Sequence, residues 1–115
     1  MEKLTFYRNC IQEILEQHAR KLAQARPLGE IETQLLFDRE HEHYQLLRIG
    51  WRDDKDHVFD CRLHLSLKND KIWIERDNTE RGIADELLEH GIPQHDIVLA
   101  FHAPYKRPYT EFAAA

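Results

Sequence analysis

The fold is decided by the stretch Val58-Phe59-Asp60-Cys61-Arg62-Leu63-His64-Leu65-Ser66-Leu67, then Lys68-Asn69-Asp70-Lys71 and Ile72-Trp73. Apolar and polar residues alternate through its first part, which predicts a strand with one face on a core. The expected core face is Phe59, Cys61, Leu63, Leu65 and Leu67, and the expected polar face is Asp60, Arg62, His64 and Ser66. Because Asn and Asp tolerate left-handed backbone angles, residues 68–71 predict a turn. The stretch therefore predicts an antiparallel hairpin.

The segments before this hairpin predict a helix and two more strands. Apolar residues recur every three or four positions from Glu2 to about Gln24, which is typical of an amphipathic helix, and Pro27 and Gly29 are expected to end it. Alternation then predicts strands over 30–38 and about 44–51, with a bend or bulge near Gly50. Short polar turns join four successive strands, so we expect an antiparallel meander whose apolar face is covered by the first helix.

The pattern changes after Ile74. Residues 77–79 offer helix caps, Glu80 falls in a first turn, and apolar residues at helical spacing predict a short second helix with Gly82 inside it and Gly91 as its left-handed cap. Pro93 is expected to start a single turn, and residues 97–101 predict a short strand or a buried extended segment. The fold class is therefore α+β: an amino-terminal amphipathic helix on a four- to five-stranded antiparallel sheet, a second helix and an extended tail. Residues 1–115 are expected to form a single domain.

Charge, apolar run length and cysteine content argue against several classes of protein. A net charge of -5 disfavours broad, non-specific binding of nucleic acid, which needs a basic surface. No apolar run is long enough to span a membrane and the amino terminus does not resemble a signal peptide, so a cytoplasmic location is expected. Cys10 and Cys61 are expected to be buried free thiols rather than a disulfide.

No catalytic, cofactor-binding or metal-binding residue is assigned from the sequence. His41 and His43 would share a strand face and could reach one ion, but a zinc site needs further ligands, and two solvated histidines are the favoured interpretation. His64 shares its predicted face with an aspartate and a serine. Alternate residues on a strand stand about 6.6 Å apart, however, which is too far for a hydrolytic triad.

The tail is the most unusual segment, because aromatic residues, two adjacent cations and two prolines follow one another closely. Its candidate partner-binding residues are His102, Tyr105, Lys106, Arg107 and Tyr109. Tyr and Arg are enriched where proteins bind one another, and the same residues could stack on bases. The alternative is a tail folded back along the sheet with its aromatics buried. If the tail binds a partner, replacing both Tyr105 and Arg107 by alanine should abolish binding without unfolding the domain.

Several stretches together resemble the XisI family, the fdxN element excision controlling factors of cyanobacteria. They are Asp38-x(5)-Tyr44-Gln45-Leu46 with Gly50-Trp51, Cys61-Arg62-Leu63-His64-Leu65, Lys71-Ile72-Trp73-Ile74, Asp77-x-Thr79-Glu80-x-Gly82-Ile83-Ala84-x-Glu86-Leu87, Gly91-Ile92-Pro93-x-x-Asp96-Ile97-Val98-Leu99-Ala100-Phe101-His102, and Pro104-Tyr105-Lys106-Arg107 with Tyr109-Thr110-x-Phe112-Ala113. The resemblance extends along the whole chain.

The resemblance implies a non-enzymatic accessory factor that acts with a companion, an XisH-like protein, in excision of a DNA element by a site-specific recombinase during heterocyst differentiation. No catalytic residues come with it. XisH resembles nuclease-fold proteins, so an alternative is a binding partner or inhibitor of such a protein, as an antitoxin is. An acidic chain suits a cationic cleft. Direct DNA contact and homo-oligomer formation stay open. A weaker hypothesis is an enzyme with His64 or His102 as general base, which would need a concave pocket.

Overall fold

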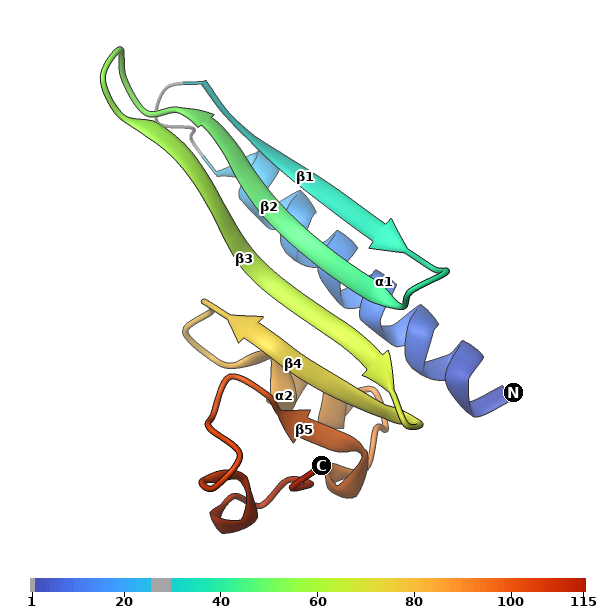
Figure 1. Ribbon diagram of the computed structural model, residues 1–115. Coiled ribbons are helices and arrows are strands. Elements are labelled where there is room, and N and C mark those ends of the chain that lie inside the picture. The colour runs from blue at the N-terminus through green and yellow to red at the C-terminus, as the bar shows by residue number, and fades with distance from the viewer. Residues whose placement is uncertain (1, 26–29) are drawn as a thin grey trace.

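A computed structural model describes residues 2–25 and 30–115 of the chain (Figure 1). The elements follow one another as α1 (Glu2–Gln24), β1 (Glu30–Asp38), β2 (His43–Trp51), β3 (His57–Lys68), β4 (Lys71–Asp77), α2 (Ile83–Glu89), the 3-10 turn η1 (Gln94–Asp96), β5 (Ile97–Leu99) and η2 (Arg107–Tyr109). The predicted helix end at Pro27 and Gly29 lies outside the described residues. None of the described helices is long and apolar enough to cross a membrane.

The five strands form one sheet in the order β1-β2-β3-β4-β5. The first four make the predicted antiparallel meander. The fifth pairs with β4 in parallel, so the sheet is mixed rather than wholly antiparallel. The physical reason is the connection: α2 and η1 carry the chain from the end of β4 back to its beginning, and such a crossover delivers a parallel strand. Asn69 and Asp70, both with positive φ, form the predicted turn between β3 and β4.

Both helices cover the same face of the sheet, behind the strands as drawn in Figure 1. Tyr7, Ile11, Ile14 and Leu15 of α1 are buried against this face, as the helical spacing predicts. The strands contribute Tyr44, Leu46, Leu63, Leu65, Leu67, Ile72, Ile74 and Ile97 to the same core, and α2 adds Ile83 and Leu87. Each fully buried aliphatic or aromatic side chain stabilises the fold by roughly 1.5–3 kcal/mol.

A β-bulge in β3 corrects the predicted faces of that strand. Leu63 pairs with Leu46 but Cys61 pairs with Leu47, so Arg62 is an extra residue that has no partner on β2. The residues before it are therefore shifted to the other face. Phe59 is 68% exposed and Cys61 is half-buried, both on the face away from the helices. Cys10 is buried as expected, and both thiols are free.

The second helix begins later than predicted, at Ile83. Gly82 is its N-cap, with φ of 93°, rather than an interior residue, and an added Cβ would meet ordinary van der Waals distances there. The backbone angle therefore requires the glycine, and close packing does not. Asp77 caps the helix from a distance, because its Oδ2 accepts a hydrogen bond of 2.6 Å from the Ile83 N–H. Gly91 follows the helix with φ of 91°, as predicted.

Polar contacts tie α1 to the rest of the domain. The Tyr7 hydroxyl donates to the buried carboxylate of Asp96, which also lies 3.0 Å from the Lys3 ammonium. The His18 ring and the Glu86 carboxylate lie 2.8 Å apart and join α1 to α2. A charged residue is almost never fully buried unless it is paired. Asp96 therefore fixes where the first and last parts of the chain meet.

Candidate functional site

The candidate site is a loop that leaves the sheet after β5 and returns to it, here called the tail loop (residues 100–113). At its start, the Phe101 N–H donates to the Ile74 carbonyl at 3.2 Å. At its end, Ala113 pairs in parallel with Val98, and its N–H donates to the Ile97 carbonyl at 2.8 Å. Figure 1 shows the loop beside β5 at the far end of the sheet from β1. The loop is therefore fixed at both ends by backbone hydrogen bonds.

Arg107 holds the loop together from inside. Its Nε donates to the His102 carbonyl and its Nη2 to the Ala100 carbonyl, both at 3.0 Å. Its guanidinium lies 5.6 Å from the centre of the Trp73 ring, and the Lys68 ammonium lies 4.1 Å from the same ring. Trp73 is only 7% exposed although it lies on the face without helices. Arg107, a predicted partner-binding residue, is thus turned toward its own domain. The attraction between the two cations and the Trp73 indole helps to hold the loop against the sheet.

The two tyrosines of the loop point into solvent. Tyr105 is 71% exposed and Tyr109 is 90% exposed, and the Lys106 ammonium lies 5.8 Å from the Tyr105 ring. The Phe112 side chain instead packs against the core. The tail is therefore folded back along the sheet, but its tyrosines are not buried. Large exposed aromatics on an anchored backbone are suited to contact with a partner, because little freedom remains to be lost on binding.

His102, the remaining candidate, is half-buried, with its ring 4.6 Å from that of Phe101. The structure thus brings all five candidates into one loop but divides them by role. Tyr105, Lys106 and Tyr109 are at the surface, whereas Arg107 and the His102 backbone form its interior. Their roles in binding stay predictions.

His64 lies next to His43 on the sheet face that carries no helix. The His43 Nδ1 and the His64 Nε2 are 3.1 Å apart. Burial lowers the pKa of His64, and the neighbouring His43 lowers it further, while Glu75 acts in the opposite direction. Neither His64 nor His102 lines the hollow between α1 and β1, the hollow beside Trp51 or the hollow beside the β3–β4 turn.

The two histidines that could have shared an ion have different partners. His41 lies in the turn before β2, with its Nδ1 2.9 Å from the Asp38 carboxylate. His43 begins β2 and contacts His64 across the strands. Among the described residues, no group of three or more His, Cys, Asp and Glu side chains is placed to hold a metal ion.

Sequence reasoning missed the residues that position the tail loop. Trp73 and Lys68 were assigned only to the hairpin, and nothing in their spacing indicates that they meet Arg107. The available signal was Trp73 between two isoleucines, because alternation then places its large aromatic ring on the opposite face from them, where it needs a cover.

Comparisons with known proteins identify the family. A model of the XisI protein family matches residues 1–114. The chain belongs to the XisI family.

Two solved structures resemble this XisI chain over nearly its whole length, and both come from Anabaena variabilis ATCC 29413. The fdxN element excision controlling factor XisI is 45% identical, with 98% of this chain and 99% of that chain covered and a TM-score of 0.84. An XisI-like protein is 35% identical, with 97% and 99% covered and a TM-score of 0.89. A search of curated proteins found no match. The α+β fold predicted from the sequence is therefore the fold of the family.

Proposed function

We propose that this chain is a regulatory, non-enzymatic accessory factor of DNA-element excision, and that it acts by binding an XisH-like partner through the tail loop. A site-specific recombinase would perform the strand cutting. The supporting relationship is the 45% identity, over 98% of this chain, to a protein that carries the name fdxN element excision controlling factor.

The observation that supports the proposed contact is that one side chain of the tail loop points inward while its two tyrosines point into solvent. The Arg107 side chain donates to two carbonyls of the loop itself, while the Tyr105 and Tyr109 rings are 71% and 90% exposed. A loop that is hydrogen-bonded at both ends and presents two tyrosines resembles a binding hot spot, in which aromatic anchors supply most of the affinity. The net charge of -5 would suit a partner that itself binds nucleic acid.

Co-purification with the XisH-like protein, followed by a nuclease and recombination assay of that protein with and without this chain, tests the proposal. We expect a stable complex that supports or stimulates excision. Absence of a complex would refute the proposed partner.

The tail loop is tested by a matched pair of variants. Tyr105→Ala plus Tyr109→Ala should weaken the complex by about tenfold or more while leaving the melting temperature unchanged, because both rings are in solvent. Phe6→Ala plus Leu36→Ala removes two exposed apolar side chains of α1 and β1, outside the loop, and should leave binding unchanged. Equal loss in both pairs would show that the tail loop is not the contact. Arg107→Ala is unsuitable as a surface variant because it removes the anchor of the loop.

A second candidate function is inhibition of a nuclease-fold partner. The observation that favours it is the net charge of -5, which suits occupation of a cationic cleft. In the same nuclease assay this function predicts suppressed cleavage within the complex, whereas the accessory function predicts a complex that remains competent for excision.

A further inference from the structure

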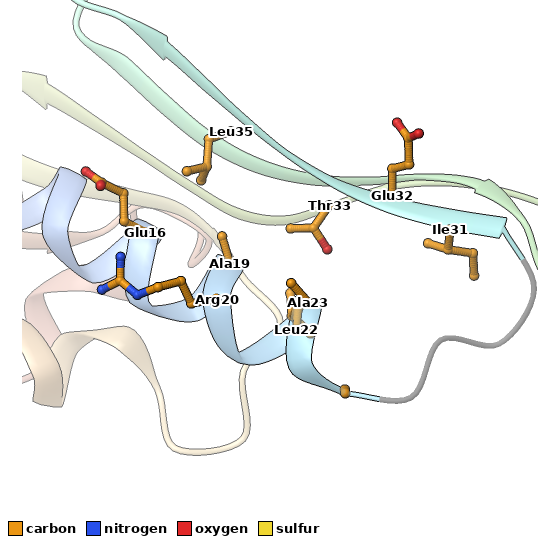
Figure 2. Close-up of a pocket in the computed structure, with 10 residues that line it drawn as sticks. Glu16, Ala19, Arg20, Leu22, Ala23, Ile31, Glu32, Thr33 and Leu35 are labelled. Carbon is orange, nitrogen blue, oxygen red and sulfur yellow. The ribbon is translucent and has the colours of Figure 1, made fainter.

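An open groove runs between the carboxyl-terminal half of α1 and the strand β1. The hollow has a volume of about 610 Å³, and its apolar lining is Ala19, Leu22, Ala23, Ile31 and Leu35, together with Thr33. We call these six residues the edge groove. Figure 2 shows the side chains of Ile31, Thr33 and Leu35 pointing from β1 toward the helix. Glu16 and Arg20 lie at its side.

The edge groove lies beside an unpaired strand edge. β1 is the first strand of the sheet, and all nine of its residues pair with β2. Within the described residues, no strand pairs with its other edge. An exposed edge offers a row of N–H and C=O groups to an added strand. Side chains of such a strand that point toward α1 would enter the edge groove, because successive side chains alternate between the two faces.

The other face of β1 carries three carboxylates. Its exposed residues are Glu30, Glu32, Gln34, Leu36 and Asp38, and the Asp38 carboxylate already lies 2.9 Å from the His41 ring. Figure 2 shows Glu32 pointing away from the helix. The residues opposite Glu30 and Glu32 on β2 are Trp51 and Ile49, so β2 provides no opposite charge for them. An added strand with lysine or arginine at alternate positions would provide that charge, since oppositely charged cross-strand neighbours attract.

The same charges disfavour a second copy of this chain at the edge. Pairing β1 with β1 of another copy would gather the carboxylates of Glu30, Glu32 and Asp38 from both copies on one face. Like charges close together across strands are destabilising, and charged residues are a common protection of edge strands against self-association. Such protection does not require an apolar hollow beneath the edge. The hollow and the carboxylates of β1 together favour an added strand that is aliphatic and basic, unlike β1 itself.

We propose that β1 and the edge groove bind an extended segment of another protein in which basic and aliphatic side chains alternate, by adding it to the sheet as a sixth strand. Its aliphatic side chains occupy the edge groove, and its basic side chains pair with the carboxylates of Glu30 and Glu32. This surface is at the opposite end of the sheet from the tail loop, and its occupation does not depend on the proposed role in excision.

The probe is a fluorescent nine-residue peptide in which lysine and valine alternate, and binding to the full chain is followed by anisotropy and by amide chemical shifts. We expect saturable binding with shifts concentrated in β1. Glu30→Lys plus Glu32→Lys should weaken it about tenfold, because two attractive neighbours become repulsive. Glu80→Lys plus Asp85→Lys makes the same change of net charge on exposed residues elsewhere and should weaken it far less.

Two further comparisons separate strand addition from simple charge attraction. Ala23→Arg fills the edge groove and should abolish binding, whereas Thr5→Arg adds the same side chain to an exposed position of α1 and should not. Peptides N-methylated at all lysine amides or at all valine amides lose their donors on opposite strand edges. One of the two should therefore bind at least tenfold more weakly than the other.

Three results would overturn the proposal. The first is equal affinity of the two methylated peptides, and the second is equal weakening by the two charge-reversal variants. The third is a dimer of the chain that dissociates on Ala23→Arg, because it would make a second copy the occupant. None of these results bears on the tail loop, so failure here and failure of the proposed function are distinguishable.

Discussion

Replacing Tyr7 by phenylalanine tests the contact that joins α1 to Asp96, the last residue of η1. The substitution removes one oxygen and keeps the ring that packs in the core. That oxygen is the donor to Asp96, whose side chain is only 7% exposed. A hydrogen bond to a charged acceptor is worth about 1.5–3 kcal/mol. Tyr7→Phe should therefore lower the free energy of unfolding by about 2 kcal/mol, because the buried Asp96 carboxylate loses this hydrogen bond. Lys3 of α1 then still contacts the carboxylate.

The assay is urea unfolding followed by circular dichroism, with a thermal scan beside it. For a domain of this size, 2 kcal/mol corresponds to a fall in Tm of about 6–10 °C. Tyr109→Phe makes the same chemical change at a ring that is 90% exposed and should leave stability unchanged. If Tyr7→Phe were no less stable than Tyr109→Phe, the Tyr7–Asp96 contact would not be holding the two elements together.

The effect has a defined pH dependence. Burial alone would raise the pKa of Asp96, but the hydrogen bonds from Tyr7 and Lys3 outweigh it and hold the pKa below its usual value. A carboxylate whose folded pKa is depressed stabilises the fold above its unfolded pKa of about 3.9, and this contribution is lost as the pH falls through the folded value. The difference between the wild type and Tyr7→Phe should thus be complete at neutral pH and shrink below about pH 4.

Three further predictions concern single positions. Gly50→Ala should destabilise the domain by about 3 kcal/mol or more in urea unfolding, because a Cβ there would lie 1.9 Å from the Glu30 carbonyl oxygen; a near-neutral result would mean that the β1–β2 end shifts freely. Asp77→Ala should cost about 1–2 kcal/mol, since it leaves the Ile83 N–H without its cap, and hydrogen exchange at the start of α2 should rise while that of α1 does not. The depressed pKa of His64 predicts a free energy of unfolding that is highest above about pH 6.5 and falls as the pH drops toward the pKa of His64 in the folded protein. His64→Gln should reduce that fall between about pH 7.5 and 5.5, and an unchanged slope would contradict the assignment.

Local pattern was sufficient for most of the fold. Period-two alternation located β1 to β3 to within a residue of their ends, whereas β4 extends to Asp77, three residues beyond its predicted end, and helical spacing identified the buried side of α1. The bulge at Arg62 could not be predicted this way, because it depends on the register between β2 and β3 and leaves the alternation in the sequence intact. The parallel direction of β5 likewise depends on the path by which α2 and η1 return the chain to the sheet.

The candidate site was predictable in composition but not in arrangement. The tail stood out because tyrosines and cations are interleaved within a few residues. Which of these side chains face outward depends on Trp73, a residue about thirty positions earlier, over which the Arg107 guanidinium lies. The acceptors of Arg107 are backbone carbonyls, which carry no sequence signal at all. The edge groove was missed for a similar reason, since it is formed by two elements that are each ordinary alone.

The burial of Trp73 beneath the tail loop gives the protein its own optical reporter. The sequence contains only one other tryptophan, Trp51, and that residue is 46% exposed at the far end of β2. A Trp51→Phe chain would therefore emit from Trp73 alone, at the wavelength of a covered indole. A partner that lifts the loop would shift this emission to the red, whereas a partner that binds the closed loop as a rigid body would leave it in place. Opening of the tail can thus be followed in real time without attaching any label.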